Sequence, residues 1–253
     1  MNTTQDYSQI ISETYDTDIT AIWRETYDYE QNTKRIMELL GNASNKSFLE
    51  LASGTGSYLN PFSDYYKSVT GLELSTYMRD ISLSKYPQFP VFLENMADFS
   101  INQSFDAIAV LCGSIAVLSQ ETEADFLTAM RAMICCCRTH LKPKGVIIIE
   151  SYDQPHTAKE WVMSQQYTFE DKYISSHTVK TIENTHFARL TKHFLVSPKI
   201  PQGKTEYIKE VHFHYLCTAD KLISLFKEQG FKIKKHVPSF AVEGRDLLIF
   251  ELE

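Results

Sequence analysis

The chain has 253 residues, 43% of them hydrophobic, and a formal net charge of −7. This length and composition suffice for one sizeable core, so a single domain carrying an insertion is expected. The negative charge and the lack of a Lys/Arg stripe argue against a nucleic-acid partner and favour a small-molecule substrate. The N-terminus lacks a basic and apolar signal segment, and the longest nearly apolar run, residues 107–118, is too short to span a bilayer. We therefore expect a cytoplasmic protein without membrane contact.

Cysteine usage agrees with a reducing compartment. The five cysteines are an odd number and show no C-x-x-C spacing: Cys112, Cys135, Cys136, Cys137 and Cys217. This pattern predicts free thiols and no metal site.

The N-terminal segment, residues 5–30, is rich in aromatic and acidic residues in a weakly helical pattern. The pattern indicates either a lid that covers a ligand or a segment whose tyrosines are ordinary packing residues of an amphipathic helix. A clearer helix is predicted over residues 30–40, and Gly41 ends it. Its buried side is expected to carry Ile36, Met37, Leu39 and Leu40.

The next stretch predicts a strand, a turn and a helix. An apolar run over residues 48–51 enters the turn Ala52-Ser53-Gly54-Thr55-Gly56. The two glycines let backbone approach a ligand closely, and the N–H groups that open the following helix favour negative charge. A plain tight turn is the alternative interpretation.

A second short strand, residues 68–72, ends on Glu73. A carboxylate at the end of the second strand of a βαβ unit can accept hydrogen bonds from both hydroxyls of a ribose. The alternative is a solvated acid at a helix entry, but Ser75 is the better helix cap.

The rest of the chain continues as alternating helices and strands, followed by a segment of different character. Helices are predicted over 58–66, 75–85, 121–140 and 221–230, the last capped by Thr218 or Asp220, and strands over 91–93, 105–111, 146–150, 231–237 and 246–252. Residues 142–145 are expected to form a loop. Period-two alternation over 178–182, 186–190 and 207–216 predicts an antiparallel cap inserted into a Rossmann-like fold.

These motifs resemble those of the class I S-adenosylmethionine-dependent methyltransferases. The resemblance covers nearly the whole chain and is carried, in family order, by residues 50–56, 71–75, 95–99, 105–108 with 114–115, and 145–150. Within the class, the chain is most similar to bacterial N-methyltransferases of nucleotide-linked aminosugars, the desosamine and mycaminose type. This implies a seven-stranded class I methyltransferase sheet that binds S-adenosyl-L-methionine.

The resemblance also implies a division of the chain and a set of site residues. The expected parts are an N-terminal lid (1–45), a cofactor-binding core (46–150), an antiparallel substrate cap (151–217) and a C-terminal helix and strands that complete the sheet (218–253). The expected cofactor-binding residues are Tyr15, Tyr27, Glu50, Ala52, Ser53, Gly54, Gly56, Glu73, Leu74, Asn95, Met96, Leu111 and Cys112. Ser114 and Arg245 are expected at the substrate, where Arg245 suits an anionic diphosphate or is a surface loop arginine.

The chemistry implied is an in-line displacement in which an acceptor lone pair attacks a sulfonium methyl. Positioning and desolvation carry most of the catalysis, and a base is needed only for a protonated acceptor. Candidate proton acceptors are Glu150, Tyr152 and His212, although the position of His212 on an alternating strand favours a packed or solvent-facing residue.

Three positions depart from the family pattern. Asn95 stands where the family has an Asp for the adenine amino group, Cys112 where it has an aromatic, and Val117 where it can carry a histidine. With the charge of −7 and no clear basic cluster in the cap, Val117 favours a smaller or uncharged acceptor. Three functions therefore stay open: N-methylation of an aminosugar, N- or O-methylation of another small metabolite, and cofactor binding without catalysis. The oligomeric state, a homodimer included, stays open too.

Overall fold

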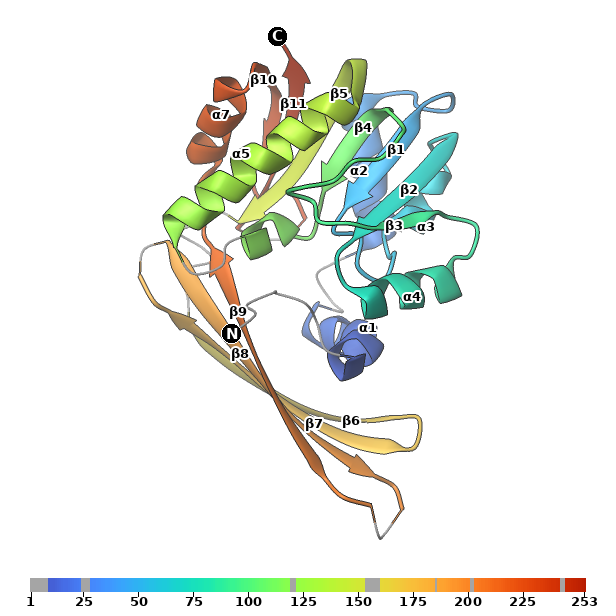
Figure 1. Cartoon of the computed structure of the whole chain (residues 1–253), viewed down its shortest axis with the longest axis vertical. Helices are drawn as coiled ribbons and strands as arrows, with labels where there is room; N and C mark the ends of the chain where they lie inside the picture. Colours follow the sequence, from blue (N-terminus) through green and yellow to red (C-terminus); the bar gives the residue numbers. More distant parts are fainter. Residues whose placement is uncertain are drawn as a thin grey trace.

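The molecule consists of two sheets with helices around the larger one (Figure 1). The computed structural model describes residues 9–23, 28–118, 122–152, 160–184, 186–200, 203–241 and 244–253, and of residues 17–23 it describes the backbone. A seven-stranded mixed sheet forms the core domain, and a four-stranded antiparallel sheet projects from it. The predicted fold class, a Rossmann-like sheet with an antiparallel cap, is confirmed.

The core sheet has the strand order β10-β11-β5-β4-β1-β2-β3. Its strands are β1 (Ser47–Leu51), β2 (Ser68–Glu73), β3 (Val91–Leu93), β4 (Phe105–Val110), β5 (Leu141–Tyr152), β10 (Phe231–Val237) and β11 (Arg245–Leu252). β1 to β5 are parallel, and β11 lies antiparallel between β5 and β10. The strand order reverses between β1 and β4. In open α/β sheets, this switch point at the carboxyl ends of the strands is where ligands bind.

Helices cover both faces of the core sheet. The structure has α2 (Tyr29–Leu40), α3 (Leu59–Ser63), α4 (Thr76–Lys85), α5 (Glu123–His140) and α7 (Ala219–Glu228) around it. Phe48 of β1 packs on the side of α2 and α3, where its ring stacks 4.1 Å from that of Phe62, while Leu49 and Leu51 pack with α5 and α7. Because both faces are covered, β1 is buried at every residue. None of the helices in the described part of the chain is long and apolar enough to span a membrane.

Hydroxyl side chains begin three of these helices. Ser75 Oγ accepts from Met78 N at 3.5 Å, and Thr218 Oγ1 accepts from Lys221 N at 3.3 Å, so both predicted caps are confirmed. Thr122 does the same for α5. The prediction of a helix over 58–66 is wrong in length, because the chain turns after Ser63 and packs Tyr66 against Phe62 before β2 begins.

β5 begins directly after α5, where a loop over residues 142–145 was predicted. Leu141 pairs with Phe105, and the register then shifts so that Val146 pairs with Ala107. Lys144 takes a φ of +65° within this bulge. The prediction failed because a bulge absorbs the extra residues without ending the strand.

The cap is a meander of four antiparallel strands: β6 (Trp161–Phe169), β7 (Lys172–Ile182), β8 (Phe187–Pro198) and β9 (Glu206–Tyr215). Of these, β6 was not predicted, since Ser164, Gln165 and Gln166 interrupt its apolar alternation. β7 and β8 are longer than predicted, and β9 has the predicted length, shifted by one residue. They carry the cap well away from the core sheet (Figure 1).

The helix α1 (Gln9–Trp23) lies between the cap and the core (Figure 1). Ile10 and Ile11 are buried against the apolar cap residues Ile174, Phe194 and Val196. On the core side, Asp16 accepts hydrogen bonds from Thr55 Oγ1 at 2.7 Å and from Lys85 Nζ at 3.0 Å. The N-terminal helix therefore joins the cap to the turn that follows β1.

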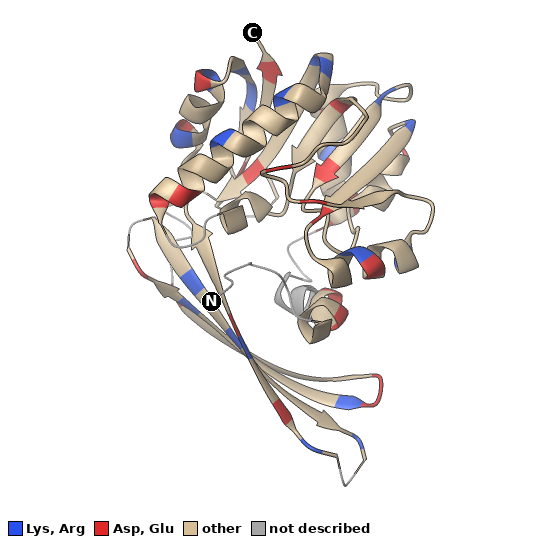
Figure 2. Cartoon of the chain, viewed as in Figure 1, with Lys and Arg blue, Asp and Glu red and all other residues tan. Residues whose placement is uncertain are grey.

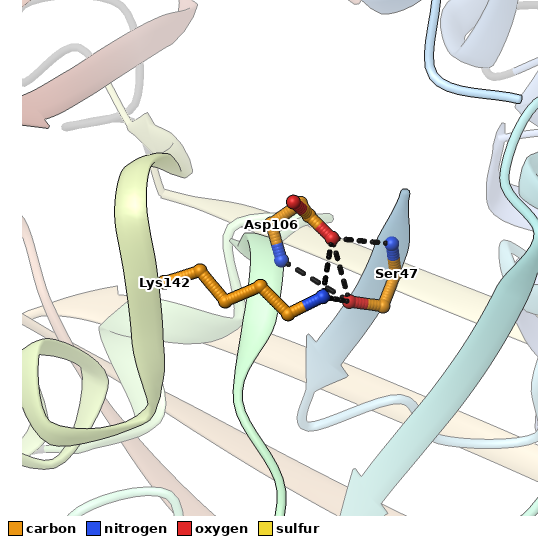
Figure 3. Close-up of polar contacts among 3 residues, drawn as sticks. All are labelled: Ser47, Asp106 and Lys142. Atoms are coloured by element: carbon orange, nitrogen blue, oxygen red, sulfur yellow. Dashed lines mark hydrogen bonds and ion pairs between the residues drawn. The ribbon is translucent and has the colours of Figure 1, made fainter. Parts of the chain in front are cut away.

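At the opposite edge of the sheet, a polar cluster ties three parallel strands together (Figure 3). Asp106 Oδ2 accepts from Ser47 N, Ser47 Oγ and Lys142 Nζ, each at 2.8 Å. Burial raises the pKa of Asp106, but these bonds from Lys142 and Ser47 outweigh it and hold the pKa below its ordinary value. This cluster links β1, β4 and β5 far from the switch point.

Candidate active site

The turn after β1 has a backbone that depends on its two glycines. Ala52, Gly54 and Gly56 have φ values of +53°, +56° and +81°. A Cβ on Gly56 would overlap Ser82 Oγ, whereas a Cβ on Gly54 would meet no atom within 4 Å. Gly56 is thus needed for packing against α4, and Gly54 leaves open space over the turn. That space is what the predicted approach of a ligand requires.

Glu73 lies beside this turn, as predicted from the spacing. Its Oε2 accepts from Gly54 N at 2.7 Å and its Oε1 from Ser75 N at 2.9 Å. The side chain is buried, so the alternative of a solvated acid is wrong. Each carboxylate oxygen can accept a further hydrogen bond, which leaves Glu73 able to receive ribose hydroxyls.

Two buried polar atoms near the turn have no hydrogen-bond partner among the residues that the structure describes. They are Glu50 Oε2 and Ser53 Oγ. Glu50 is 4% exposed, and burial, together with the nearby charge of Glu73, raises its pKa well above the ordinary range. Buried polar atoms are normally satisfied, so this pair fits a ligand that brings its own polar groups, such as the ribose and amino groups of S-adenosyl-L-methionine.

The residues expected around the adenine lie at the ends of β2 and β3. Leu74 is 44% exposed directly after Glu73, and Met96 is 8% exposed. Asn95 is exposed, and its Oδ1 accepts from Ala97 N at 2.9 Å. The oxygen predicted to bind the adenine amino group therefore already holds the local turn and has one lone pair left.

A second strained turn follows β4. Cys112 and Gly113 have φ values of +54° and +68°, and Ser114 N closes the turn on the carbonyl of the buried Leu111 at 3.0 Å. The next residues form the short 3₁₀ helix η1 (Ser114–Leu118). A Cβ on Gly113 would lie 2.6 Å from the Tyr152 ring. Glycine is needed here because Tyr152 covers the turn at close range.

Glu150 binds the backbone of this turn, and Arg245 in turn binds Glu150. Glu150 Oε2 accepts from Cys112 N at 3.0 Å, and its Oε1 lies 3.2 Å from Arg245 Nη1. Arg245 Nη2 also donates to the Tyr152 hydroxyl at 3.3 Å. Arg245 is 5% exposed, so the alternative of a surface loop arginine is wrong. The structure thus brings Glu150, Tyr152 and Arg245 into one network with Cys112.

The histidines of β9 divide between two environments. His212 is buried in the cap, with Nε2 3.0 Å from Glu210 Oε2. His214, which was not predicted as a site residue, lies beside Tyr152, with ring centroids 6.4 Å apart. Loss of hydration, followed by the charges of His212, Lys180, Lys192 and Arg245, lowers the pKa of His214 to about 3. The described part of the cap therefore places two buried lysines, Lys180 and Lys192, near enough to His214 to lower its pKa.

Of the two tyrosines expected in the lid, Tyr15 is half-buried on α1, and Tyr27 lies outside the described residues. Tyr29, which begins α2, was not predicted as a site residue, yet its side chain contacts Cys112. Burial, and then the charge of Cys112 and a hydrogen bond with its thiol, raise the pKa of Tyr29. Its position in a Tyr-Asp-Tyr-Glu run at the end of the lid was the one available signal.

The described residues contain no group of three or more His, Cys, Asp or Glu side chains placed to hold a metal. The polar groups at the switch point are carboxylates, which accept hydrogen bonds, and backbone N–H groups, which donate them. Both can bind the polar groups of an organic ligand.

Comparison with known proteins places these features in a family. Residues 23–236 match the methyltransferase domain family. A dTDP-4-amino-2,3,4,6-tetradeoxy-D-glucose N,N-dimethyltransferase from Saccharopolyspora spinosa is 28% identical over 204 residues, covering 81% of this chain and 78% of its own. A dTDP-3-amino-3,6-dideoxy-alpha-D-glucopyranose N,N-dimethyltransferase from Streptomyces fradiae is 26% identical over 242 residues, which cover 90% of this chain and 86% of that protein.

Solved structures share the whole architecture. The sugar N-methyltransferase KedS8 from a Streptoalloteichus species superposes with a TM-score of 0.78 at 23% identity, covering 100% of this chain and 98% of its own. DesVI from Streptomyces venezuelae gives a TM-score of 0.75 at 22% identity, and the match covers 95% of this chain and 98% of DesVI. At this identity, the likeness establishes the fold.

Proposed function

The chain belongs to the methyltransferase domain family and uses S-adenosyl-L-methionine as its methyl donor, and we propose that its acceptor is the amine of a nucleotide-linked aminosugar. The observation that carries the proposal is the similarity, over most of both chains, to two relatives that are named as dTDP-aminosugar N,N-dimethyltransferases. The cationic residues beside the site support it, since a nucleotide-linked acceptor is anionic.

We infer that the turn after β1 holds the donor. Glu73 is the acceptor for the ribose hydroxyls, and Gly54 allows the backbone to approach. The Glu50 and Ser53 atoms that lack a partner among the described residues suit the ribose and amino groups of the cofactor. Leu74 and Met96 offer apolar surface to the adenine. When bound, the cofactor supplies an activated methyl group that an acceptor lone pair can displace.

Glu150 acts as a positioning residue in this proposal. Its carboxylate is wholly buried and holds both Cys112 N and Arg245, which fixes the turn where the acceptor meets the donor. Tyr152, packed on Gly113, forms one wall of that place and excludes water from it. Catalysis then rests on orientation and desolvation of a neutral amine. The excess proton of the product leaves to solvent.

We further propose that the core, residues 46–150, binds the donor and the cap, residues 151–217, selects the acceptor. A cytoplasmic location without a nucleic-acid or membrane partner is also proposed. The supporting facts are that none of the five cysteines forms a disulfide and that the net charge is −7.

Activity screening tests the acceptor class. The protein is incubated with S-adenosyl-L-methionine and, in separate reactions, with dTDP-linked aminosugars, the same aminosugars without nucleotide, simple amines and phenols. Mass spectrometry reads the number of methyl groups added. We expect one or two methyl groups on the dTDP-linked aminosugars, because the relatives are named as N,N-dimethyltransferases.

Two outcomes would contradict this proposal in different ways. Turnover only with acceptors that lack phosphate would reject the nucleotide-linked class. No turnover with any acceptor, in a protein that binds the cofactor by calorimetry, would favour cofactor binding without catalysis.

A further inference from the structure

One face of the cap sheet has two parts with different chemistry. Toward α1 it is apolar, because Ile174, Phe194 and Val196 pack there against Ile10 and Ile11. Farther along the same face, the side chains become polar and charged: Thr178 and Lys180 on β7, Lys192 on β8, and Glu210, His212 and His214 on β9. This second part leads toward Tyr152. Figure 2 shows basic residues in the part of the cap strands nearer the core.

The strand register brings the two lysines together. Thr178 pairs with Lys192, so Lys180, two residues further along β7, is the diagonal neighbour of Lys192. Diagonal neighbours on one face have Cβ atoms about 7 Å apart, within reach of each other's side chains. Lys180 is 9% exposed and Lys192 is 8% exposed. Two lysine side chains are therefore buried at diagonally adjacent positions of one face.

Burial of a lysine side chain removes water from its ammonium group and favours contact with anions. Burial lowers the pKa of Lys180, because an ammonium group loses hydration there. Glu210, which pairs with Lys192 across the strands, supplies one negative charge, and it also contacts His212. Among the described residues, this polar part of the face thus carries two lysines and one carboxylate. A buried site with positive potential favours an anionic ligand.

We propose that Lys180 and Lys192 bind the diphosphate of the nucleotide-linked acceptor, an inference that rests on the acceptor class proposed above. A diphosphate carries negative charge on two adjacent phosphorus centres, which matches two ammonium groups on neighbouring strands. The Arg245 guanidinium is held by Glu150 and serves the turn, so the lysines supply the charge for the ligand. His214 and Tyr152 connect this pair to the Cys112 turn. A sugar lying over them would have its amine at the turn and its diphosphate at the lysines.

Nucleotide binding in the absence of turnover tests this inference. Calorimetry measures the dissociation constant of dTDP for the protein saturated with S-adenosylhomocysteine, for the wild type and for Lys180→Met and Lys192→Met. Methionine keeps the length and packing of the side chain and removes the charge. We expect each variant to bind dTDP about ten- to a hundredfold more weakly, the loss for one charge-assisted contact. Lys209→Met is the matched control, because Lys209 is exposed on β9 and faces the other side of the sheet. It should bind as the wild type does.

A comparison of ligands keeps the test decisive if the variants do not fold. Thymidine, which lacks the diphosphate, should bind the wild type much more weakly than dTDP, and added salt should weaken dTDP alone. Equal affinity for thymidine and dTDP, or wild-type dTDP affinity in folded Lys180→Met and Lys192→Met, would overturn the inference. Lysine-dependent dTDP binding without methylation of any dTDP-aminosugar would support this site and reject the proposed acceptor amine, so the two failures are distinguishable.

Discussion

The guanidinium of Arg245 lies 3.2 Å from the Glu150 carboxylate, in an ion pair whose side chains are 6% and 0% exposed. The pair joins the ends of β5 and β11 beneath the Cys112 turn. Because neither charge reaches water, each depends on the other. This relationship changes what a substitution at Arg245 should do.

Arg245→Ala should lower the free energy of unfolding by about 3–5 kcal/mol, since it leaves a carboxylate buried without its counter-ion. Denaturant unfolding measures the loss. Arg131→Ala is the control, because its pair with Glu228 is 44% and 46% exposed and should contribute less than about 1 kcal/mol. An Arg245→Ala protein as stable as the control variant would show that the pair is not structurally important.

The double variant Glu150→Gln, Arg245→Met separates this role from direct binding of a diphosphate. The amide oxygen of Gln can still accept from Cys112 N, and no charge is left unpaired. If Arg245 serves only the turn, the double variant should recover most of the stability and keep a Michaelis constant for the nucleotide acceptor near that of the wild type. A Michaelis constant that stays raised at unchanged turnover would restore Arg245 as an anchor for a remote group.

Glu73→Ala should weaken the binding of S-adenosyl-L-methionine by roughly 2 kcal/mol, the scale for a charge-assisted pair of hydrogen bonds. The substitution also removes the acceptor that holds Gly54 N at 2.7 Å. Calorimetry on folded protein gives the affinity. Glu94→Ala, which changes the next acid at the end of β3, should have little effect. The same affinity in Glu73→Ala as in the wild type would remove Glu73 from the cofactor site.

Cofactor binding should protect the N-terminal segment from proteolysis. Asp16 of α1 accepts from Thr55 in the cofactor turn and from Lys85, so ordering of the turn should also hold α1. Cleavage before Glu30 should slow when cofactor is added. Asp16→Ala should cancel most of that protection, while Asp80→Ala, which removes an exposed acid on α4, should not. Cleavage rates that do not respond to cofactor in the wild type would count against a lid.

Stability should fall in acid partly through Asp106. Its folded-state pKa lies below the ordinary value because Lys142 and Ser47 hydrogen-bond the carboxylate (Figure 3). A lowered folded pKa means that the contribution is complete above the unfolded pKa, about 3.9 for Asp, and is lost as pH falls through the folded pKa. Asp106→Asn should therefore flatten the acid limb of a stability–pH curve. An acid limb identical to that of the wild type would show that other carboxyl groups dominate.

Local sequence patterns determined most of the core domain. The β1 turn needs Gly54 and Gly56 for their positive φ, Ser75 and Thr218 are good helix caps, and the apolar strands have the period of doubly covered parallel strands. These features depend on neighbours within a few residues, so the order of residues specifies them. The acid at the end of β2 was predicted for the same reason.

Other features depend on contacts between distant segments. The burial of Arg245 against Glu150 joins residues 95 positions apart, and no local pattern distinguishes that arginine from one in a surface loop. β6 was missed because its polar residues hide the alternation, and pairing with β7 supplies the structure.

The charged residues of the cap show most clearly what the sequence determined and what the tertiary structure determined. The sequence by itself established a methyltransferase-like core, a cofactor turn with its acid, and an alternating insertion. It showed no basic cluster, because Lys180, Lys192 and His212 occur singly on three strands. The register of the antiparallel strands places them on one face, and there the folded chain buries them. Tertiary structure alone decided that these scattered side chains share one buried face. Electrostatic interaction depends on distance in space and on dehydration, and neither follows from separation along the chain.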